Sequence, residues 1–302
     1  MRIVFGDLSL GVQDGDRRYI FSYAQAGLES LVKEGVEWMY RAPRPSFWRA
    51  STDNDRGNGF SLGSACWLGA DLYIKPSAVR AEIDGTALDL SSLKAPGNNA
   101  LMASPLREAD FAQISFTYLT ATDPEAEVEV VYKAGRGRLG VSYEYRGRPG
   151  LPGLPVAGLR FVLPCPVSGY CYRGLSGETY PDRKAGAVKG RYHVKGMPVT
   201  PYIVPQECGM HMDTEELKLS MRSSSLTIAK LEKPFGFSLL PYTAVELECA
   251  MHQDELPPVR RSVLLIAAAV RGVGGINSWG AAPEARYELD ASAVYRTSFV
   301  IE

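Results

Sequence analysis

The stretch AEVEVVYKAGRGRLGVSYEY, residues 126–145, decides the fold class. Apolar and polar side chains alternate in 126–132 and again in 139–145, a period of two that is typical of a strand with one buried face. The intervening KAGRGR, residues 133–138, contains glycines that can adopt positive φ, so an antiparallel hairpin is predicted. The segment AQISFTYLT, residues 112–120, alternates in the same way and predicts a neighbouring strand.

Strand patterns recur along the rest of the chain, and helix signals are few. Further strands are predicted at 2–12, 18–25, 158–164, 217–221, 225–231, 262–270 and 295–302. The best helix signal is a capping box formed by Thr243 and Glu246, with a short helix to about Met251 that ends before Pro257. A second helical turn is expected near 61–68. Many strands with few helices predict an all-β fold, a large antiparallel sandwich of two sheets.

The densest cluster of proline and glycine lies at 148–158, with the sequence RPGLPGLPVAG. Predicted strands flank this cluster on both sides, and it is short. We therefore interpret it as a loop inside a single domain that spans residues 1–302, and not as a linker between two domains.

Composition and charge exclude several classes of partner. The 302 residues include 33 basic and 34 acidic side chains, so the formal net charge is −1 and gives no electrostatic hold on nucleic acid or on an anionic membrane. The longest apolar stretch, 263–270, is far shorter than the ~20 residues that span a bilayer, and no signal-peptide pattern opens the sequence. The five cysteines are scattered without a C-x-x-C pair. We expect a cytoplasmic protein with reduced thiols, no bound metal, and neither nucleic acid nor membrane as a partner.

Three segments carry the most specific information. They are Phe47–Gly57 (FWRASTDNDRG), Gly174–Arg183 (GLSGETYPDR) and Gly272–Gly280 (GVGGINSWG). In this order they resemble the C-terminal domain of the large bacterial β-galactosidases, glycosidases built around a TIM barrel. The sequence is more similar still to the small subunit of heterodimeric β-galactosidases, in which this domain is a separate polypeptide.

The resemblance implies a galactose-mutarotase-like supersandwich that works with a large subunit. That large subunit is expected to supply the catalytic glutamates together with Mg and Na, and to hydrolyse terminal β-D-galactosides such as lactose. By the same resemblance, this chain contains no catalytic residue and needs no cofactor of its own. It is expected to be inactive alone and to complete the galactoside site of the assembled enzyme.

Trp279 is the candidate substrate contact. Glycines precede it in the segment and Gly280 follows, a setting that suits an exposed, shaped loop better than a packed strand. A flat indole offers an apolar platform to a sugar ring and an N–H donor. The resemblance implies that this Trp stacks on substrate, with Ser278 and Asn277 beside it. The other tryptophans, Trp38, Trp48 and Trp67, are expected in the core.

The acidic turn of the first segment is interpreted as structural. Asp53, Asn54 and Asp55 lack the spacing of an EF-hand, and Asp or Asn in turns usually bonds nearby backbone. Arg49 and Arg56 are natural ion-pair partners for these carboxylates. Contact with the large subunit or with sugar is an additional expectation for Arg49, Asp53 and Asp55.

The second segment contains a pair of carboxylates, Glu178 and Asp182. Glycoside hydrolysis needs two carboxyl groups about 5–9.5 Å apart, a separation that a glycine- and proline-interrupted segment does not reveal. The resemblance places the catalytic pair in the large subunit. Glu178, Tyr180, Asp182 and Arg183 are therefore expected to be structural, to contact the large subunit or to lie near the sugar.

Two other functions remain open from the sequence. A free-standing aldose 1-epimerase would need a histidine acid and a carboxylate base, and His211 with Glu207 is the pair to consider. A galactoside-binding module would bind sugar without any large subunit.

Overall fold

A computed structural model describes residues 1–92, 106–277 and 280–302. Within these ranges the chain forms 21 strands, β1 to β21, and three short α-helices, α1 to α3. All strand pairings between them are antiparallel. The all-β antiparallel prediction is confirmed.

Hydrogen bonding divides the strands into three sheets. The ten-stranded sheet has the order β15 (Lys189–Lys195), β14 (Gly169–Leu175), β17 (Glu216–Met221), β18 (Ser224–Lys230), β21 (Val294–Ile301), β12 (Arg138–Arg146), β11 (Glu127–Gly135), β10 (Ala112–Leu119), β7 (Lys75–Ile83) and β8 (Thr86–Ala87). The six-stranded sheet has the order β5 (Val36–Glu37), β4 (Gly27–Lys33), β3 (Arg17–Ser22), β2 (Ser9–Asp14), β1 (Arg2–Phe5) and β9 (Leu106–Glu108). The five-stranded sheet has the order β16 (Met210–Thr214), β19 (Phe235–Leu240), β20 (Ser262–Val270), β13 (Val156–Leu163) and β6 (Arg41–Ser46).

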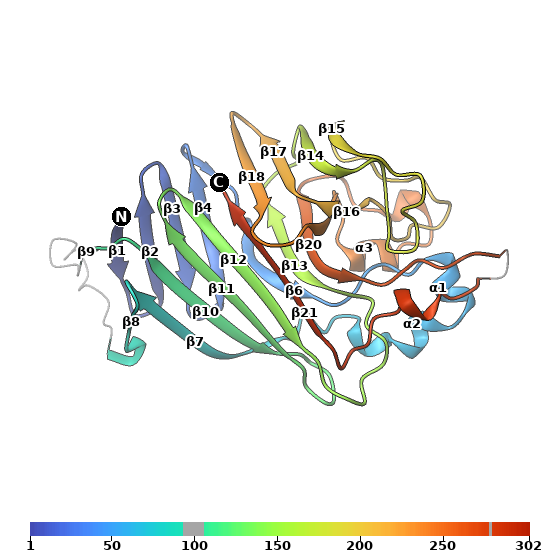
Figure 1. Cartoon of the computed structure of the whole chain (residues 1–302), viewed down its shortest axis with the longest axis horizontal. Helices are drawn as coiled ribbons and strands as arrows, with labels where there is room; N and C mark the ends of the chain where they lie inside the picture. Colours follow the sequence, from blue (N-terminus) through green and yellow to red (C-terminus); the bar gives the residue numbers. More distant parts are fainter. Residues whose placement is uncertain (93–105, 278–279) are drawn as a thin grey trace.

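The two smaller sheets cover the same face of the ten-stranded sheet. Phe21 of β3 packs on Tyr132 of β11 with ring centroids 5.5 Å apart, and Phe161 of β13 packs on Phe299 of β21 at 6.2 Å. Tyr132 and Phe299 both lie opposite Val141 of β12, so they point to one face. The molecule is therefore a two-layer sandwich whose second layer is split into two sheets (Figure 1).

The predicted hairpin forms between β11 and β12. Arg136 and Gly137 take positive φ at its turn, and every second side chain of the neighbouring β10 is buried. The single strand expected at 2–12 is instead two strands. A turn in which the Gly6 N–H donates to the Ser9 carbonyl at 3.0 Å separates β1 from β2.

The helices gather at the end of the molecule opposite the N-terminus (Figure 1). They are α1 (Asp53–Gly57), α2 (Phe60–Gly63) and α3 (Ala244–Cys249), with 3-10 turns at η1 (Ala65–Trp67), η4 (Gln253–Glu255) and η5 (Ala285–Tyr287). A further 3-10 turn, η2 (Leu90–Ser92), follows β8 on the N-terminal side of the molecule (Figure 1). The predicted capping box of Thr243 and Glu246 starts α3, and the turn expected near 61–68 is α2 with η1. The core expectation for Trp38, Trp48 and Trp67 is confirmed, since each is at most 5% exposed.

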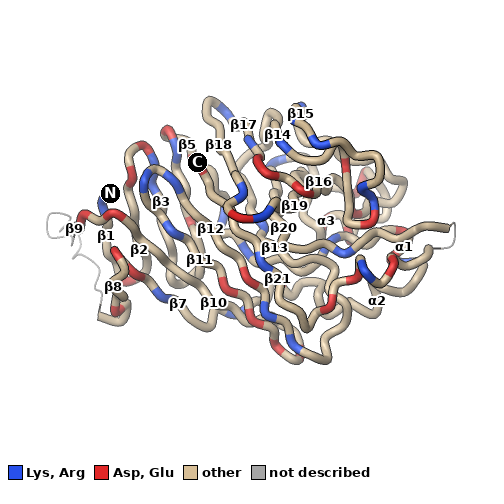
Figure 2. Tube along the Cα trace, in the orientation of Figure 1, with Lys and Arg blue, Asp and Glu red and all other residues tan. Residues whose placement is uncertain are grey.

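Basic and acidic side chains are mixed along the strands, and neither sign dominates the view in Figure 2. No helix in the described ranges has the length and apolar character needed to cross a bilayer. The 148–158 segment connects β12 of the large sheet to β13 of the five-stranded sheet.

Candidate functional site

The three sequence segments meet at one cleft near the helical end of the molecule. The cleft has a volume of about 460 Å³. Its lining residues come from the first segment (Thr52, Asp53, Asn54), the second (Glu178, Tyr180, Arg183), the third (Val273, Gly274, Gly275) and a fourth stretch (Tyr202, Gln206, Glu207). Residues far apart in the sequence therefore build a single site.

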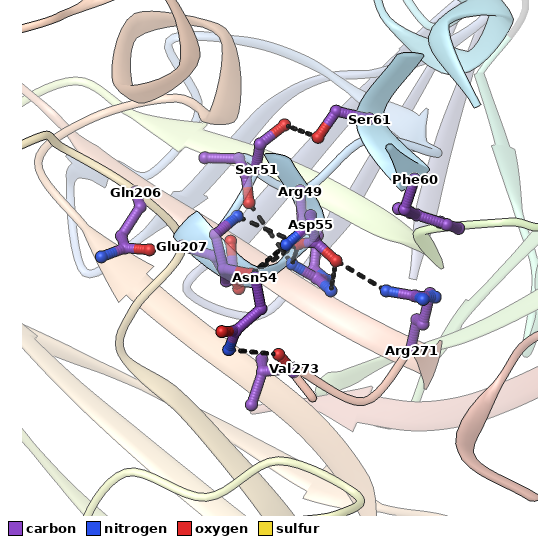
Figure 3. Close-up of polar contacts among 12 residues, drawn as sticks. Arg49, Ser51, Asn54, Asp55, Phe60, Ser61, Gln206, Glu207, Arg271 and Val273 are labelled. Carbon is purple, nitrogen blue, oxygen red and sulfur yellow. Dashed lines mark hydrogen bonds and ion pairs between the residues drawn. The ribbon is translucent and has the colours of Figure 1, made fainter. Parts of the chain in front are cut away.

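Asp55 of α1 is buried between two arginines (Figure 3). Its carboxylate contacts Arg49 Nη1 at 2.7 Å and Arg271 Nη1 at 2.6 Å, and all three side chains are only 2% exposed. Burial opposes ionisation of Asp55, but the positive charge of Arg49 and the hydrogen bonds from Thr52 and Arg49 together outweigh burial and keep the pKa of this carboxyl below its usual value. Arg271 also pairs with Glu288 at 2.6 Å and lies over the ring of Phe60.

Asp55 also completes the capping box at the start of α1. The Thr52 hydroxyl accepts from the Asp55 N–H at 3.1 Å, while the Asp55 carboxylate accepts from the Thr52 N–H at 3.0 Å. Asp53, two residues earlier and exposed, pairs with Arg56 at 3.2 Å. Both expected ion pairs of the acidic turn therefore form, and contact of Arg49, Asp53 or Asp55 with the large subunit or with sugar remains a prediction.

The third segment is bound through its backbone by side chains of the second. Asp182 accepts from the Val273 N–H at 3.0 Å and from the Gly274 N–H at 2.8 Å. Arg183 donates to the Gly274 carbonyl, and the Arg183 N–H donates to the Tyr180 carbonyl at 2.8 Å to close the turn that carries Asp182. The Asp182 side chain is 5% exposed, so both of its oxygens are committed to this loop.

Side chains of the first segment bind the same loop. Asn54 donates from Nδ2 to the Val273 carbonyl at 2.9 Å (Figure 3). Arg49 donates from Nη2 to the Gly272 carbonyl at 3.0 Å. Glycine at these positions lets the bonded side chains approach the loop closely. A Cβ on Gly275 would lie 2.3 Å from Asn54 Nδ2, and a Cβ on Gly272 would lie 2.8 Å from the Asp182 carboxyl carbon.

Glu207 is a buried carboxyl at the wall of the cleft, 7% exposed. The Tyr180 hydroxyl donates to its Oε1 at 3.4 Å. Burial raises the pKa of Glu207 to about 7, since the favourable charge of Arg49 is opposed by the nearby negative charge of Glu178. This carboxyl therefore exchanges its proton near neutral pH.

The rim of the cleft presents groups suited to a hydroxyl-rich ligand. Asp53 and Gln206 bond each other twice: the Asp53 N–H donates to Gln206 Oε1 at 2.8 Å, and Gln206 Nε2 donates to Asp53 Oδ2 at 3.2 Å. Glu178 is exposed and accepts from the Thr200 hydroxyl at 3.1 Å. Tyr202 adds a ring that is 37% exposed. Carboxylate, amide and aromatic groups of this kind can accept from sugar hydroxyls and pack on a sugar ring.

Two of the three predicted substrate contacts, Ser278 and Trp279, lie outside the described residues. Asn277, the third, is exposed, and its Oδ1 accepts from the Ala281 N–H at 3.1 Å. Asn277 therefore bonds across the loop that carries the other two, and its contact with substrate remains a prediction.

Both ring nitrogens of His211 contact hydrogen-bonding partners, and an acid in an epimerase would have to be free of them to reach a substrate. Its Nδ1 lies 2.7 Å from the Gly177 carbonyl, its Nε2 lies 3.1 Å from the Tyr170 hydroxyl, and its ring stacks on Phe237. Burial lowers the pKa of His211 to about 4, so the imidazole is neutral at physiological pH. Glu207 bonds Tyr180 instead, and in the described structure the two residues do not form the pair considered from the sequence.

Sequence reasoning missed several members of this site. Arg271 directly follows the apolar strand β20, and an arginine at the end of such a run is the signal that could have marked it. Asn54 gave no signal beyond its place in the first segment, and Gln206 lies outside all three segments. In the described ranges no group of three or more His, Cys, Asp or Glu side chains could hold a metal ion, and the five cysteines, all in those ranges, are free.

The chain is similar to known proteins over its whole length. The family model "Beta galactosidase small chain" matches residues 13–301. The β-galactosidase small subunit of Latilactobacillus sakei is 47% identical over 97% of this chain and 94% of that protein. The β-galactosidase of Streptococcus thermophilus is 32% identical over 100% of this chain, which spans only 28% of that longer protein.

Among solved structures, a galactose mutarotase-like protein from Lactobacillus casei aligns over 97% of this chain and 99% of its own, with 11% identity and a TM-score of 0.44. A likeness this distant carries no conclusion about function. The family match and the identity to the curated small subunit are decisive. The chain belongs to the β-galactosidase small chain family.

Proposed function

We propose that this chain is the small subunit of a β-galactosidase. It binds a larger catalytic subunit, and the two together hydrolyse terminal β-D-galactosides such as lactose. Family membership supports this proposal, as does the longer Streptococcus thermophilus relative, in which the matching region is 28% of a single polypeptide. Because this region is part of the same polypeptide as the rest of the enzyme in such relatives, we expect it to bind the large subunit non-covalently here.

The meeting of the three segments at one cleft supports a part in the sugar site. The cleft offers hydrogen-bonding groups for sugar hydroxyls, and the loop beside it leads to Asn277, Ser278 and Trp279. We propose that Trp279 provides a platform that positions the sugar in the second subsite, a proximity contribution. The exposed carboxylates Asp53 and Glu178 are proposed to lie near the sugar or the large subunit.

The catalytic carboxyl pair is proposed to reside in the large subunit. Asp182 is poorly suited to be one of the pair, because both of its oxygens accept backbone N–H groups and its side chain is 5% exposed. Asp55 is likewise committed to two arginines. Mg and Na are proposed for the large subunit only, and the assembled enzyme is proposed to be cytoplasmic.

An assay of the chain alone and with its large subunit tests this proposal. We expect no hydrolysis of lactose by the chain alone and full activity on mixing, with activity saturating as the chain is added to a fixed amount of large subunit. Turnover by the chain in preparations free of large subunit would contradict the proposal. Sugar-anomer exchange by the chain alone would indicate an epimerase, and galactoside binding by the chain alone would indicate a binding module.

A further inference from the structure

The loop that follows β20 has a partner for each backbone polar group from the Gly272 N–H to the Gly275 N–H. Side chains bond five of these seven groups: the N–H groups of Val273 and Gly274 and the carbonyls of Gly272, Val273 and Gly274. The other two are satisfied by backbone: the Gly272 N–H donates to the Tyr287 carbonyl at 2.9 Å, and the Gly275 N–H donates to the Ala281 carbonyl at 2.8 Å. A loop with every peptide bonded in this way has little freedom to tilt.

Asp182 makes the strongest of these contacts. A carboxylate that accepts from two successive N–H groups forms two charge-assisted bonds, each stronger than a bond between neutral groups. Asp182 is itself fixed, because it follows Pro181 in the tight turn closed by Tyr180 and Arg183. The second segment thus determines where the base of the loop lies.

We propose that Asp182 is a positioning residue of the galactosidase reaction, which acts by fixing the base of the loop that carries Trp279. This inference rests on the proposed function, since it assigns a way for Asp182 to act through Trp279. Asp182 does not touch substrate in this proposal. Its contribution is to the alignment of the sugar in the second subsite, where a misplacement of about 1 Å can cost up to about 100-fold in rate.

Asp182→Asn changes this contact with little change in shape. A carboxamide has one acceptor oxygen, so one of the two loop N–H groups faces an NH₂ group and loses its partner. Hydrogen exchange of the isolated chain should show the amides of Val273 and Gly274 exchanging about tenfold faster or more, equivalent to about 1.4 kcal/mol.

Asp84 provides a matched control. A single oxygen, Oδ1, accepts from two successive N–H groups, those of Asp110 at 3.0 Å and Phe111 at 2.9 Å, near the β7–β8 hairpin and outside the cleft. The oxygen of a carboxamide can still accept both bonds, so Asp84→Asn should change exchange at 110–111 much less than Asp182→Asn changes it at 273–274, and should leave 273–274 unchanged. Unchanged exchange at 273–274 in Asp182→Asn would overturn the inference without any enzyme assay.

A double-mutant cycle in the reassembled enzyme tests the positioning role. Trp279→Ala should raise KM for lactose or lower transfer to sugar acceptors, and Asp182→Asn should shift the same parameters in the same direction, by about three- to tenfold. In the Trp279→Ala background, Asp182→Asn should change them by less than about twofold, because the two residues act through one interaction. Asp84→Asn should match the wild type throughout.

The outcomes distinguish failure of this inference from failure of the proposed function. Normal kinetics for Asp182→Asn in an enzyme that responds to Trp279→Ala would overturn the role of Asp182 and leave the proposed function intact. Additive effects would show that Asp182 acts independently of Trp279, which also overturns it. If Trp279→Ala has no effect, the platform part of the proposed function is wrong and the inference is overturned with it. Should Asp182→Asn not assemble, Asn54→Ala removes the bond to the Val273 carbonyl of the same loop and must show the same kinetic pattern.

Discussion

Asp55 accepts from Arg49, from Arg271 and from the N–H of Thr52, so it joins the start of α1 to the end of β20. A buried charge network of this kind adds little stability compared with apolar packing, but removing Asp55 leaves the buried Arg49 without its ion-pair partner. The network fixes the position of Arg49, which also donates to the Gly272 carbonyl at the base of the loop.

Asp55→Asn is therefore expected to destabilise the chain strongly. The buried Arg49 guanidinium loses its ion-pair partner, and Arg271 keeps only Glu288. This should lower the free energy of unfolding by about 3–5 kcal/mol in urea titrations. Asp53→Asn is the control, because Asp53 pairs with Arg56 on the surface and should cost at most about 1 kcal/mol. Equal costs for the two substitutions would contradict the buried network.

Glu207 should make stability depend on pH in the opposite sense to most carboxyls. Its folded pKa of about 7 exceeds the usual 4.5, so between these values the folded chain binds more protons than the unfolded chain. Stability from this group is then complete below pH ~4.5 and is lost as pH rises through ~7. Glu207→Gln mimics the protonated form and removes this dependence.

Unfolding of wild type and Glu207→Gln at several pH values between 5 and 8.5 measures the effect. The variant should gain on the wild type as pH rises, by a total of about 3 kcal/mol, on the basis of ~1.4 kcal/mol for each pKa unit. A difference between the two proteins that stays constant over this range would show that the pKa of Glu207 is not raised by folding.

At the scale of elements, the sequence predicted the strands that alternate or that form continuous apolar runs. β10, β11, β12 and β20 were recognisable for this reason. β15 escaped because its side chains alternate only between half-buried and exposed, and β19 because glycine and serine interrupt its short apolar run. Burial in these strands is set by the neighbouring sheets, which a local pattern does not record.

The two capping boxes also differ in how clearly the sequence shows them. Thr243 and Glu246 match the usual spacing and residue types, so α3 was predicted. Thr52 and Asp55 form the same pair of bonds, but with Asp at the third position and a helix of only five residues the signal resembled a turn. α1 was therefore expected as an acidic turn, although the ion pairs of that turn were predicted correctly.

Thr243→Ala should destabilise the chain by about 1 kcal/mol, because the cap that accepts from the Glu246 N–H at 3.2 Å is lost. The effect reaches beyond α3, since Glu248 on this helix accepts from the Ser51 N–H at 2.6 Å and from Trp48 Nε1 at 3.2 Å. Thr243→Ser keeps the hydroxyl and should restore most of the stability. Thermal and urea unfolding of the three proteins check this, and a serine variant as unstable as the alanine variant would contradict capping.

At the scale of the whole molecule, the two-layer sandwich was predictable but its division was not. The split of the second layer depends on which strands pair across long separations in sequence, such as β13 with β6. The cleft likewise could be predicted only in part from the sequence. The motifs indicated which segments matter, whereas the contacts of Arg271, Gln206 and Asn54 depend on how three distant segments meet.

The last prediction concerns assembly. If the chain completes an active site with a large subunit, the two should form a stable interface, and obligate interfaces usually bury more than about 2,000 Å². Size-exclusion chromatography of the mixed chains should show one complex that survives dilution to assay concentrations. Because a partner that binds only the folded chain stabilises it, the unfolding free energy of this chain should rise by about 4 kcal/mol when the large subunit is present at 1,000 times its Kd. Separate elution at every concentration, with an unchanged melting temperature, would show that the chain does not act as a subunit.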